Sequence, residues 1–228
     1  LVELYVRDEA INRLYYDLLI PLQAFPRMGE DNKTRMDIQT VLNNAINLID
    51  MRLPYSPKFY QTLAQAQAYL EEELYEKMGG NDSVIATCIG HTHIDVAWWW
   101  TVAQTREKVV RSFATVLKLM EEYPNYKFMS SQPVLYYFLK QRYPELYEKI
   151  KQRVAEGRWE TEGGMWLEAD CNLTSGESLV RQFLHGKRFF REEFNQDNKI
   201  LWLPDVFGYS GALPQIMRKS GIDYFMTT

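Results

Sequence analysis

Apolar residues in the first third of the chain recur at steps of three and four, which is the spacing of one face of an α-helix. One such stripe lies between Ile38 and Ile49, and a second runs from about Phe59 to Met78. Pro54 and Pro57 separate the two stripes. No cluster of chemically active side chains accompanies them. We therefore predict that residues 1–80 form a helical supporting region.

The pattern changes after the turn-forming run Gly79-Gly80-Asn81-Asp82. Short apolar runs of strand length then alternate with amphipathic helical stripes. The expected strands are 84–90, 126–129, 158–167, 200–203 and 222–226, and the expected helices are 102–122, 133–155, 176–194 and 212–220. This alternation predicts βαβ units and a mostly parallel sheet, so the fold class is α/β, with the strands forming part of a barrel or of an open sheet.

Composition and charge narrow the possible functions. The chain is 46% hydrophobic and 25% charged, as is ordinary for a globular protein. Its formal charge of -4, without a basic stripe, argues against nucleic-acid binding. No apolar run approaches the ~20 residues that cross a bilayer, so we expect no membrane partner. Two cysteines are too few for a disulfide framework. Cys88 lies in an apolar run, which predicts a buried free thiol, a reducing compartment and a cytoplasmic location.

The first polar cluster, His91-Thr92-His93-Ile94-Asp95, stands at the end of the expected strand 84–90. Side chains alternate along an extended chain, so His91, His93 and Asp95 share one face. Two imidazoles and a carboxylate that converge indicate a divalent metal site, and such donors suit zinc. Histidines with a purely structural role are the alternative. The run Trp98-Trp99-Trp100 follows, and at least one of these rings is a candidate platform for a sugar, with burial in the core as the alternative.

Two further clusters of acidic residues follow later strands. Glu168 and Asp170 come after the expected strand 158–167, where they could point into a site or merely belong to a solvated loop or helix cap. Asp205 follows the strand 200–203 and precedes a turn with Gly208, so it could be a metal ligand, a nucleophile or a capping residue. Because functional groups collect at the carboxyl ends of parallel strands, we expect the three clusters to meet.

Taken in order, the clusters give the chain a resemblance to glycoside hydrolase family 38, the retaining α-mannosidases. The resemblance is carried by GHTHIDVAWWW, GGMWLEADCNLTSGESLVRQFLHG and LPDVFGYSGALPQIMRKSGI, between about Ser83 and Thr228. The motif HTHIDVAW and the helical region are more similar to the bacterial and cytosolic branch of the family than to the Golgi and lysosomal enzymes. The resemblance implies that residues 83–228 are the N-terminal portion of a (β/α) barrel-like catalytic domain, incomplete in this chain.

The resemblance also implies roles for single residues. His93 and Asp95 would be zinc ligands, and Asp205 would be both a zinc ligand and the nucleophile that hydrolyses terminal α-mannosides by double displacement. His91 matches the first histidine of the motif, which lies near the metal, so we keep it as a further candidate ligand. The candidate substrate contacts are Trp98, which would stack on the sugar, Glu168 and Asp170. The expected partner is an α-mannoside oligosaccharide.

Some parts of the family's site are not matched in this chain. Family members complete the zinc shell with a histidine far downstream and take the general acid/base from a later carboxylate, expected beyond Thr228. His185 lies inside an expected helix, and we assign it no metal role. We therefore expect these residues alone to be inactive and to hold zinc weakly or not at all. Full-length relatives commonly associate, which leaves a homo-oligomer open.

Two other functions fit the same residues. A zinc-dependent carbohydrate deacetylase or amidohydrolase would use similar ligands to activate water against an amide or ester. A non-catalytic mannose-binding module would use Trp98 and zinc without turnover. The presence of Asp205 argues against the second alternative, because binding alone needs no nucleophile.

Overall fold

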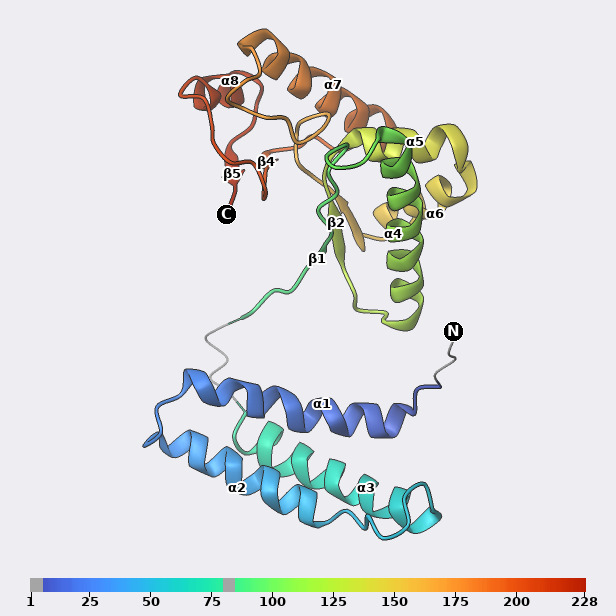
Figure 1. Ribbon diagram of the computed structural model, residues 1–228, viewed down its shortest axis with the longest axis vertical. Coiled ribbons are helices and arrows are strands. Elements are labelled where there is room, and N and C mark those ends of the chain that lie inside the picture. Colours follow the sequence, from blue (N-terminus) through green and yellow to red (C-terminus); the bar gives the residue numbers. More distant parts are fainter. Residues whose placement is uncertain (1–5, 80–84) are drawn as a thin grey trace. The chain divides into compact units, whose positions relative to one another are not determined.

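The computed structural model describes residues 6–79 and 85–228, and Figure 1 shows its course from the N-terminus to the C-terminus. The chain divides into two compact units, Leu1–Ile85 and Ala86–Thr228. We call them the helical unit and the α/β unit, and each is described by itself.

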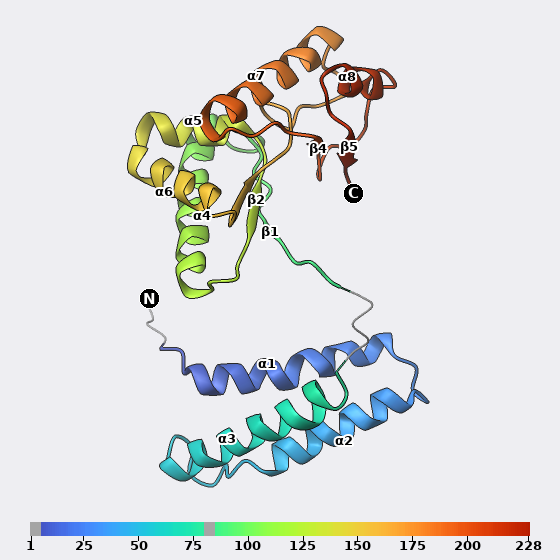
Figure 2. The ribbon, with the colours of Figure 1, turned by 180° about the vertical axis from the view of Figure 1, so that it is seen from behind.

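The helical unit consists of helices that lie side by side (Figures 1 and 2), and their buried apolar residues form one core cluster. Its elements are α1 (Glu9–Ala24), the 3₁₀ turn η1 (Phe25–Arg27), α2 (Lys33–Asn47), α3 (Pro57–Leu70) and the π-helical turn η2 (Glu71–Glu76). Asp8, Asn32 and Ser56 cap the three α-helices, each accepting a hydrogen bond from a backbone N–H of the first turn. The two stripes that the sequence shows thus correspond to α2 and to α3 with its continuation in η2.

The apolar run before the first motif is not the buried strand that its composition predicts. In the described part of it, residues 85–89 have no regular structure, and Ile85 is 86% exposed. Val84 lies outside the described residues. Strand β1 covers only Gly90–His91, which pair with Phe128 and Met129. The prediction failed because a strand needs backbone partners, and no described segment pairs with residues 85–89. Cys88 is accordingly exposed, and the buried free thiol is that of Cys171.

The α/β unit alternates strands with helices, as predicted. Its elements after β1 are α4 (Val102–Glu122), β2 (Phe128–Ser130), α5 (Pro133–Arg142), α6 (Pro144–Ala155), β3 (Trp159–Thr161), α7 (Gly176–Phe194), β4 (Ile200–Trp202), α8 (Leu213–Lys219) and β5 (Tyr224–Met226). The expected helix 133–155 is two helices, because Pro144 lacks the backbone N–H that would continue the first one. No described helix has both the length and the apolar character needed to cross a membrane.

The strands are parallel and follow one another in sequence order. One sheet has the order β1-β2-β3 and a second pairs β4 with β5. A parallel bridge between Gly163 and Leu201 connects the end of β3 to β4. The mixed fold of helices and parallel strands confirms the predicted α/β class, although the strands are only two or three residues long. Because the strands are parallel, their carboxyl ends lie on the same side of each sheet.

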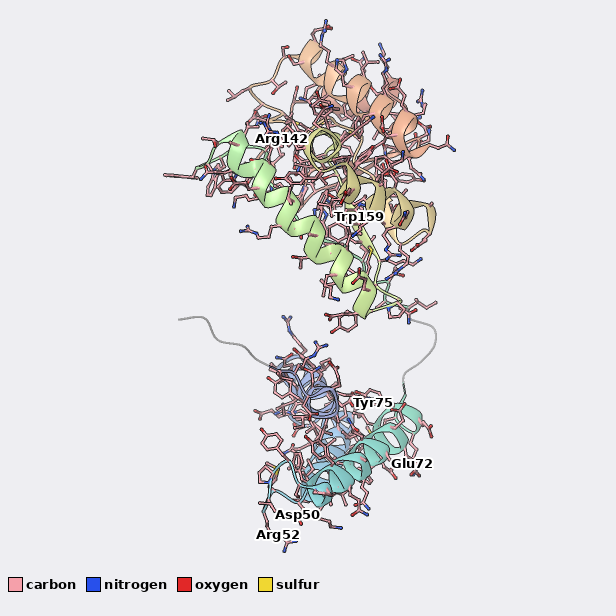
Figure 3. The ribbon with its side chains drawn as sticks, turned by 90° about the vertical axis from the view of Figure 1, so that its right-hand side faces the viewer. Asp50, Arg52, Glu72, Tyr75, Arg142 and Trp159 are labelled. Carbon is pink, nitrogen blue, oxygen red and sulfur yellow. The ribbon has the colours of Figure 1, made fainter. Side chains whose placement is uncertain are left out.

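Aromatic residues form the core that fixes the end of β2. Trp159, labelled in Figure 3, is 1% exposed and lies edge-on against Phe113 and Phe128, with ring centroids 5.0 and 4.7 Å away. Its indole N–H donates to the Tyr136 hydroxyl at 2.8 Å, which in turn donates to the Ser130 carbonyl at 2.9 Å. The core therefore holds the backbone immediately before Ser131, where the site begins.

Candidate metal and substrate site

The site is assembled from the loops that follow β1, β2, β3 and β4. Gln132, in the loop after β2, ties two of the others together: its amide N–H donates to the Ile94 carbonyl at 2.8 Å, and its amide oxygen accepts from the Glu168 backbone N–H at 3.1 Å. Gln132 is 3% exposed and has a φ of 63°, a left-handed backbone that is uncommon outside glycine. Such strain persists only where the surroundings determine it, and it is concentrated at functional sites.

Three of the predicted residues converge. His93, Asp95 and Asp205 each offer one ligand atom, and these atoms all lie within 4.8 Å of one another. His93 Nε2 is 3.2 Å from Asp95 Oδ1 and 3.6 Å from Asp205 Oδ2. One imidazole nitrogen and two carboxylate oxygens form a donor set that fits zinc, and two carboxylates so close to each other favour a cation between them. The residues of this metal group thus fit the ion that the resemblance implies.

Glu168 lies behind His93. Its Oε2 is 3.0 Å from His93 Nδ1, on the opposite side of the ring from Nε2, and its Oε1 accepts a hydrogen bond from the Ser131 hydroxyl at 2.8 Å. At 3.0 Å the first contact is an ion pair by distance, and neither of these two buried atoms has a partner that meets hydrogen-bond geometry. The Glu168 carboxylate raises the pKa of His93 to about 9; burial of the ring opposes this rise and Asp95 adds to it.

His91 lies beside the metal group and does not belong to it. Its Nδ1 is 3.0 Å from the Met129 carbonyl, and its Nε2 is 3.2 Å from the indole Nε1 of Trp202. A carbonyl only accepts and an indole N–H only donates, so Nδ1 carries the proton and Nε2 accepts. Both ring nitrogens are engaged, which leaves no lone pair directed at a metal. The ring therefore connects the end of β1 to β2 and to the end of β4.

The predicted substrate contacts differ in their surroundings. Trp98 is 69% exposed, and its ring meets those of Trp99 and Trp100 edge-on, with centroids 5.6 Å apart in both pairs. An exposed indole held by its neighbours has a face available for stacking. Asp170 is also exposed, but its Oδ1 accepts from the backbone N–H groups of Asn172 and Leu173, at 2.9 and 2.7 Å. That carboxylate oxygen therefore stabilises the turn that Asp170 begins.

Three residues of the site were not singled out in the sequence: Ser131, Gln132 and Trp202. The rule that functional groups collect at strand ends, applied to the expected strand 126–129, would have pointed to the run Ser130-Ser131-Gln132. Nothing local to Trp202 indicates its contact with His91, because the two residues are 111 positions apart.

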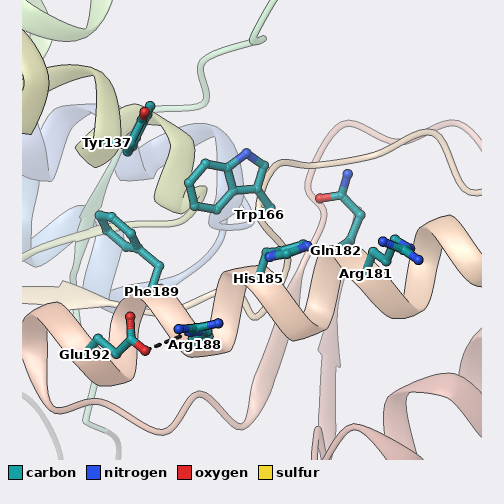
Figure 4. Close-up of a pocket in the computed structure, with 8 residues that line it drawn as sticks. All are labelled: Tyr137, Trp166, Arg181, Gln182, His185, Arg188, Phe189 and Glu192. Atoms are coloured by element: carbon teal, nitrogen blue, oxygen red, sulfur yellow. Dashed lines mark hydrogen bonds and ion pairs between the residues drawn. The ribbon is translucent and has the colours of Figure 1, made fainter.

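A separate hollow of about 440 Å³ lies along α7 (Figure 4). The rings of Tyr137, Trp166 and Phe189 line it and pack against one another, with centroids 5.8 and 5.7 Å apart. Arg188 is paired with Glu192 at 2.7 Å, the dashed line of Figure 4. His185 also lines this hollow and lies outside the group formed by His93, Asp95 and Asp205.

Comparison with known proteins identifies the protein family. Residues 83–228 match the model of the N-terminal domain of the glycosyl hydrolases family 38. The chain therefore belongs to this family of glycoside hydrolases, which confirms the resemblance seen in the three motifs.

Individual relatives show how similar the chain is to members of this family. The chain is 37% identical to "Alpha-mannosidase G" of Dictyostelium discoideum over 228 residues, and 39% identical to "Alpha-mannosidase 2C1" of Homo sapiens over 225 residues. These matches cover 99% of the chain but only 20% and 21% of the relatives, so the chain spans about a fifth of their length. The crystal structure of an alpha-mannosidase from Enterococcus faecalis V583 matches with a TM-score of 0.56 and 26% identity, over 61% of this chain and 16% of that one.

Proposed function

We propose that the full-length protein containing this chain is a zinc-dependent retaining α-mannosidase that hydrolyses terminal α-mannosides. The observation that carries the proposal is the convergence of His93, Asp95 and Asp205 from the ends of β1 and β4. Family membership and relatives named alpha-mannosidase support the choice of substrate.

His93 Nε2 and carboxylate oxygens of Asp95 and Asp205 would hold the zinc ion. A bound zinc supplies Lewis-acid binding of sugar hydroxyls, which orients the ring. The rest of the reaction depends on protein groups. The Asp205 side chain is 54% exposed, so a sugar can reach it, and the Tyr209 hydroxyl donates to the Val206 carbonyl at 2.9 Å, which steadies the loop that carries it.

Asp205 is the proposed nucleophile. Its carboxylate oxygen attacks the anomeric carbon while the bond from that carbon to the glycosidic oxygen breaks, and the departing oxygen takes a proton from a general acid. The product is a glycosyl ester of Asp205. Water, deprotonated by the same acid/base group, then attacks the anomeric carbon, releases the carboxylate and gives a sugar of retained configuration.

The acid/base group is not assigned to any described residue. Glu168 is engaged with Ser131 and His93, and Asp170 is held in its turn through Oδ1. We propose that this group, and a further zinc ligand, come from parts of the full-length protein outside these 228 residues, and that this chain alone is inactive. Trp98 would provide the platform for the sugar ring, and Asp170 stays a predicted substrate contact.

A cytoplasmic location is the second part of the proposal. It is supported by the free thiols of Cys88 and Cys171, and in particular by the exposure of Cys88, because an exposed free thiol is best preserved in a reducing compartment. A thiol count under native conditions, made on residues 1–228, tests the exposure of Cys88 on which this part rests, with one accessible thiol expected.

Hydrolysis of a synthetic aryl α-mannoside by the full-length protein tests the mannosidase proposal. Activity should be lost on chelation and return with zinc. Asp205→Asn should lower kcat by on the order of 10³-fold or more, the scale on which loss of a nucleophile acts. Asp50→Asn in the helical unit is the control and should leave kcat unchanged. Turnover that survives chelation would exclude the metal, and release of acetate from an acetylated sugar with its glycosidic bond intact would replace the mannosidase by a deacetylase.

A further inference from the structure

Glu168 is the most deeply buried carboxylate of the site. Its side chain is 4% exposed, against 36% for Asp95 and 54% for Asp205. Both of its oxygens face protein groups, since Oε1 accepts from the Ser131 hydroxyl and Oε2 faces His93 Nδ1. A sugar hydroxyl would have little access to this carboxylate, and both of its oxygens already lie against protein groups. The sequence placed Glu168 among the substrate contacts, and its surroundings suit a different role.

We propose that Glu168 is a positioning residue for His93: it binds the ring through Nδ1 and thereby directs Nε2 at Asp95 and Asp205. The inference rests on the proposed zinc site, because it is the metal that Nε2 would meet there. It adds a residue that acts through a ligand and touches neither the ion nor the sugar.

The geometry of His93 carries the argument. Nε2 lies 3.2 Å from Asp95 Oδ1 and 3.6 Å from Asp205 Oδ2, whereas Nδ1 lies 3.0 Å from Glu168 Oε2. A metal needs the lone pair of Nε2, so the ring proton has to be on Nδ1, where a carboxylate is the best available acceptor. A carboxylate on the far nitrogen of a ligating histidine fixes its tautomer and orientation and strengthens its donation to the metal.

Glu168 is itself fixed from two sides. The Ser131 hydroxyl holds one oxygen, and the Gln132 side chain accepts from the Glu168 backbone while donating to the carbonyl of Ile94, next to His93. The loop that carries Glu168 also approaches Ser131 closely: a Cβ on Gly163 would lie 2.6 Å from the Ser131 Cβ. This packing holds the start of that loop close to Ser131 without any ligand.

The test is the zinc affinity of Glu168→Ala, Glu168→Gln and Ser131→Ala in the full-length protein. Competition between the protein and a chromophoric chelator for zinc ions gives the dissociation constant. Glu168→Ala should weaken zinc binding by roughly 10–100-fold, the usual effect of losing such a partner. Glu168→Gln keeps an acceptor of the same shape and should restore part of this loss, and Ser131→Ala should have the smallest effect. Glu160→Gln, on the exposed face of β3, is the matched control and should bind zinc as the wild type does.

The outcomes separate the inference from the proposed function. With zinc saturating, the KM for an aryl α-mannoside should stay close to that of the wild type in Glu168→Gln. A raised KM with unchanged zinc affinity would make Glu168 a substrate contact and overturn the inference. A wild-type protein that binds no zinc would refute the proposed function, and this inference with it. If Glu168→Ala does not fold, as judged by thermal unfolding, Glu168→Gln and Ser131→Ala decide the question.

Discussion

The two units bury polar groups to very different extents. The buried polar side chain described in the helical unit is that of Thr62, whose hydroxyl donates to carbonyls of its own helix. Most of its charged pairs are local, such as Asp50 with Arg52, labelled in Figure 3, and the pair of Arg13 with Glu71 joins distant parts of the unit. The α/β unit buries a longer series of polar side chains: Thr105, Ser130, Ser131, Gln132, Thr161, Lys187 and Asn198.

We relate this difference to the two expected roles, which are support for the helical unit and binding for the α/β unit. A buried polar group lowers stability unless it is hydrogen-bonded, so a unit that only supports has little reason to hold many. In the α/β unit these groups connect loops: Gln132 joins Ile94 to Glu168, and Asn198 donates to the carbonyl of Thr161. Four of them, Ser130, Ser131, Gln132 and Thr161, lie at or just after the carboxyl ends of β2 and β3. Substitutions in the helical unit should therefore change stability, whereas substitutions among the strand ends should also change zinc binding.

The largest effect is expected from Leu70→Ala in α3. Leu70 is fully buried in the core of the helical unit, so truncation should lower the free energy of unfolding of that unit by about 2–5 kcal/mol. Zinc affinity should stay unchanged, because Leu70 has no part in the core clusters of the α/β unit. Chemical denaturation and zinc titration of the same samples measure both quantities. A parallel loss of zinc binding would show that the two units are coupled and would break the comparison.

A smaller effect, confined to the α/β unit, is expected from Gly186→Ala in α7. Alanine improves helix propensity by about 1 kcal/mol. A Cβ on Gly186, however, would lie 2.3 Å from the Gly164 carbonyl oxygen and 2.5 Å from the Met165 carbonyl carbon, which are backbone atoms of the loop leading to Glu168. Overpacking of this kind costs about 1–3 kcal/mol, so after the gain in helix propensity we expect a net loss of up to about 2 kcal/mol.

Gly176→Ala is the matched control in the same helix. Nothing lies within 4 Å of a Cβ at Gly176, so the substitution should be neutral or should stabilise by about 0.4–1 kcal/mol. Urea denaturation of both variants gives the comparison. Equal stability of the two would mean that the loop yields to the added methyl group, and that the close packing beside Glu168 is not rigid.

The sequence predicted the elements better than it predicted the contacts between them. The expected helices 102–122 and 176–194 coincide with α4 and α7, because an amphipathic stripe reports local structure. The expected strand 84–90 shrank to Gly90–His91, since an apolar run says nothing about which backbone is available to pair with it.

The same limit applies to the site. The convergence of His93, Asp95 and Asp205 could be expected from motifs at strand ends. The pairing of Glu168 with His93 joins residues 75 positions apart in the chain, and that of Trp202 with His91 joins residues 111 apart. Such contacts depend on the register of several strands and on the bend at Gly163 and Gly164, both of which have positive φ. Periodicity along the chain contains no information on either.

The smallest effect concerns one acidic residue in each unit that is paired with basic side chains. In the α/β unit, Asp197 lies 3.0 Å from Lys199 and 3.1 Å from Lys187, and these two ammonium groups lower its pKa to about 2 against a slight effect of burial. In the helical unit, Arg52 lowers the pKa of Asp50 to about 2. A carboxyl whose pKa is lowered by folding stabilises the native state above its unfolded pKa of about 3.9. That contribution is lost as the pH falls from about 4 to about 2.

Asp197→Asn should therefore lower the Tm at neutral pH, and the gap to the wild type should close as the pH falls from 4 to 2. Asp50→Asn should show a smaller gap, because Asp50 and Arg52 are two residues apart and keep part of their attraction in the unfolded chain. The larger effect of Asp197→Asn comes from Lys187, whose buried ammonium also donates to the carbonyls of Asn198 and Gly221. Without Asp197, the charge of this buried ammonium is less compensated. Thermal unfolding followed by circular dichroism at several pH values measures both gaps. If the Tm difference between Asp197→Asn and the wild type is as large at pH 2 as at pH 7, the substitution acts through packing. If Asp50→Asn shows an equal Tm difference at neutral pH, the buried Lys187 contributes nothing.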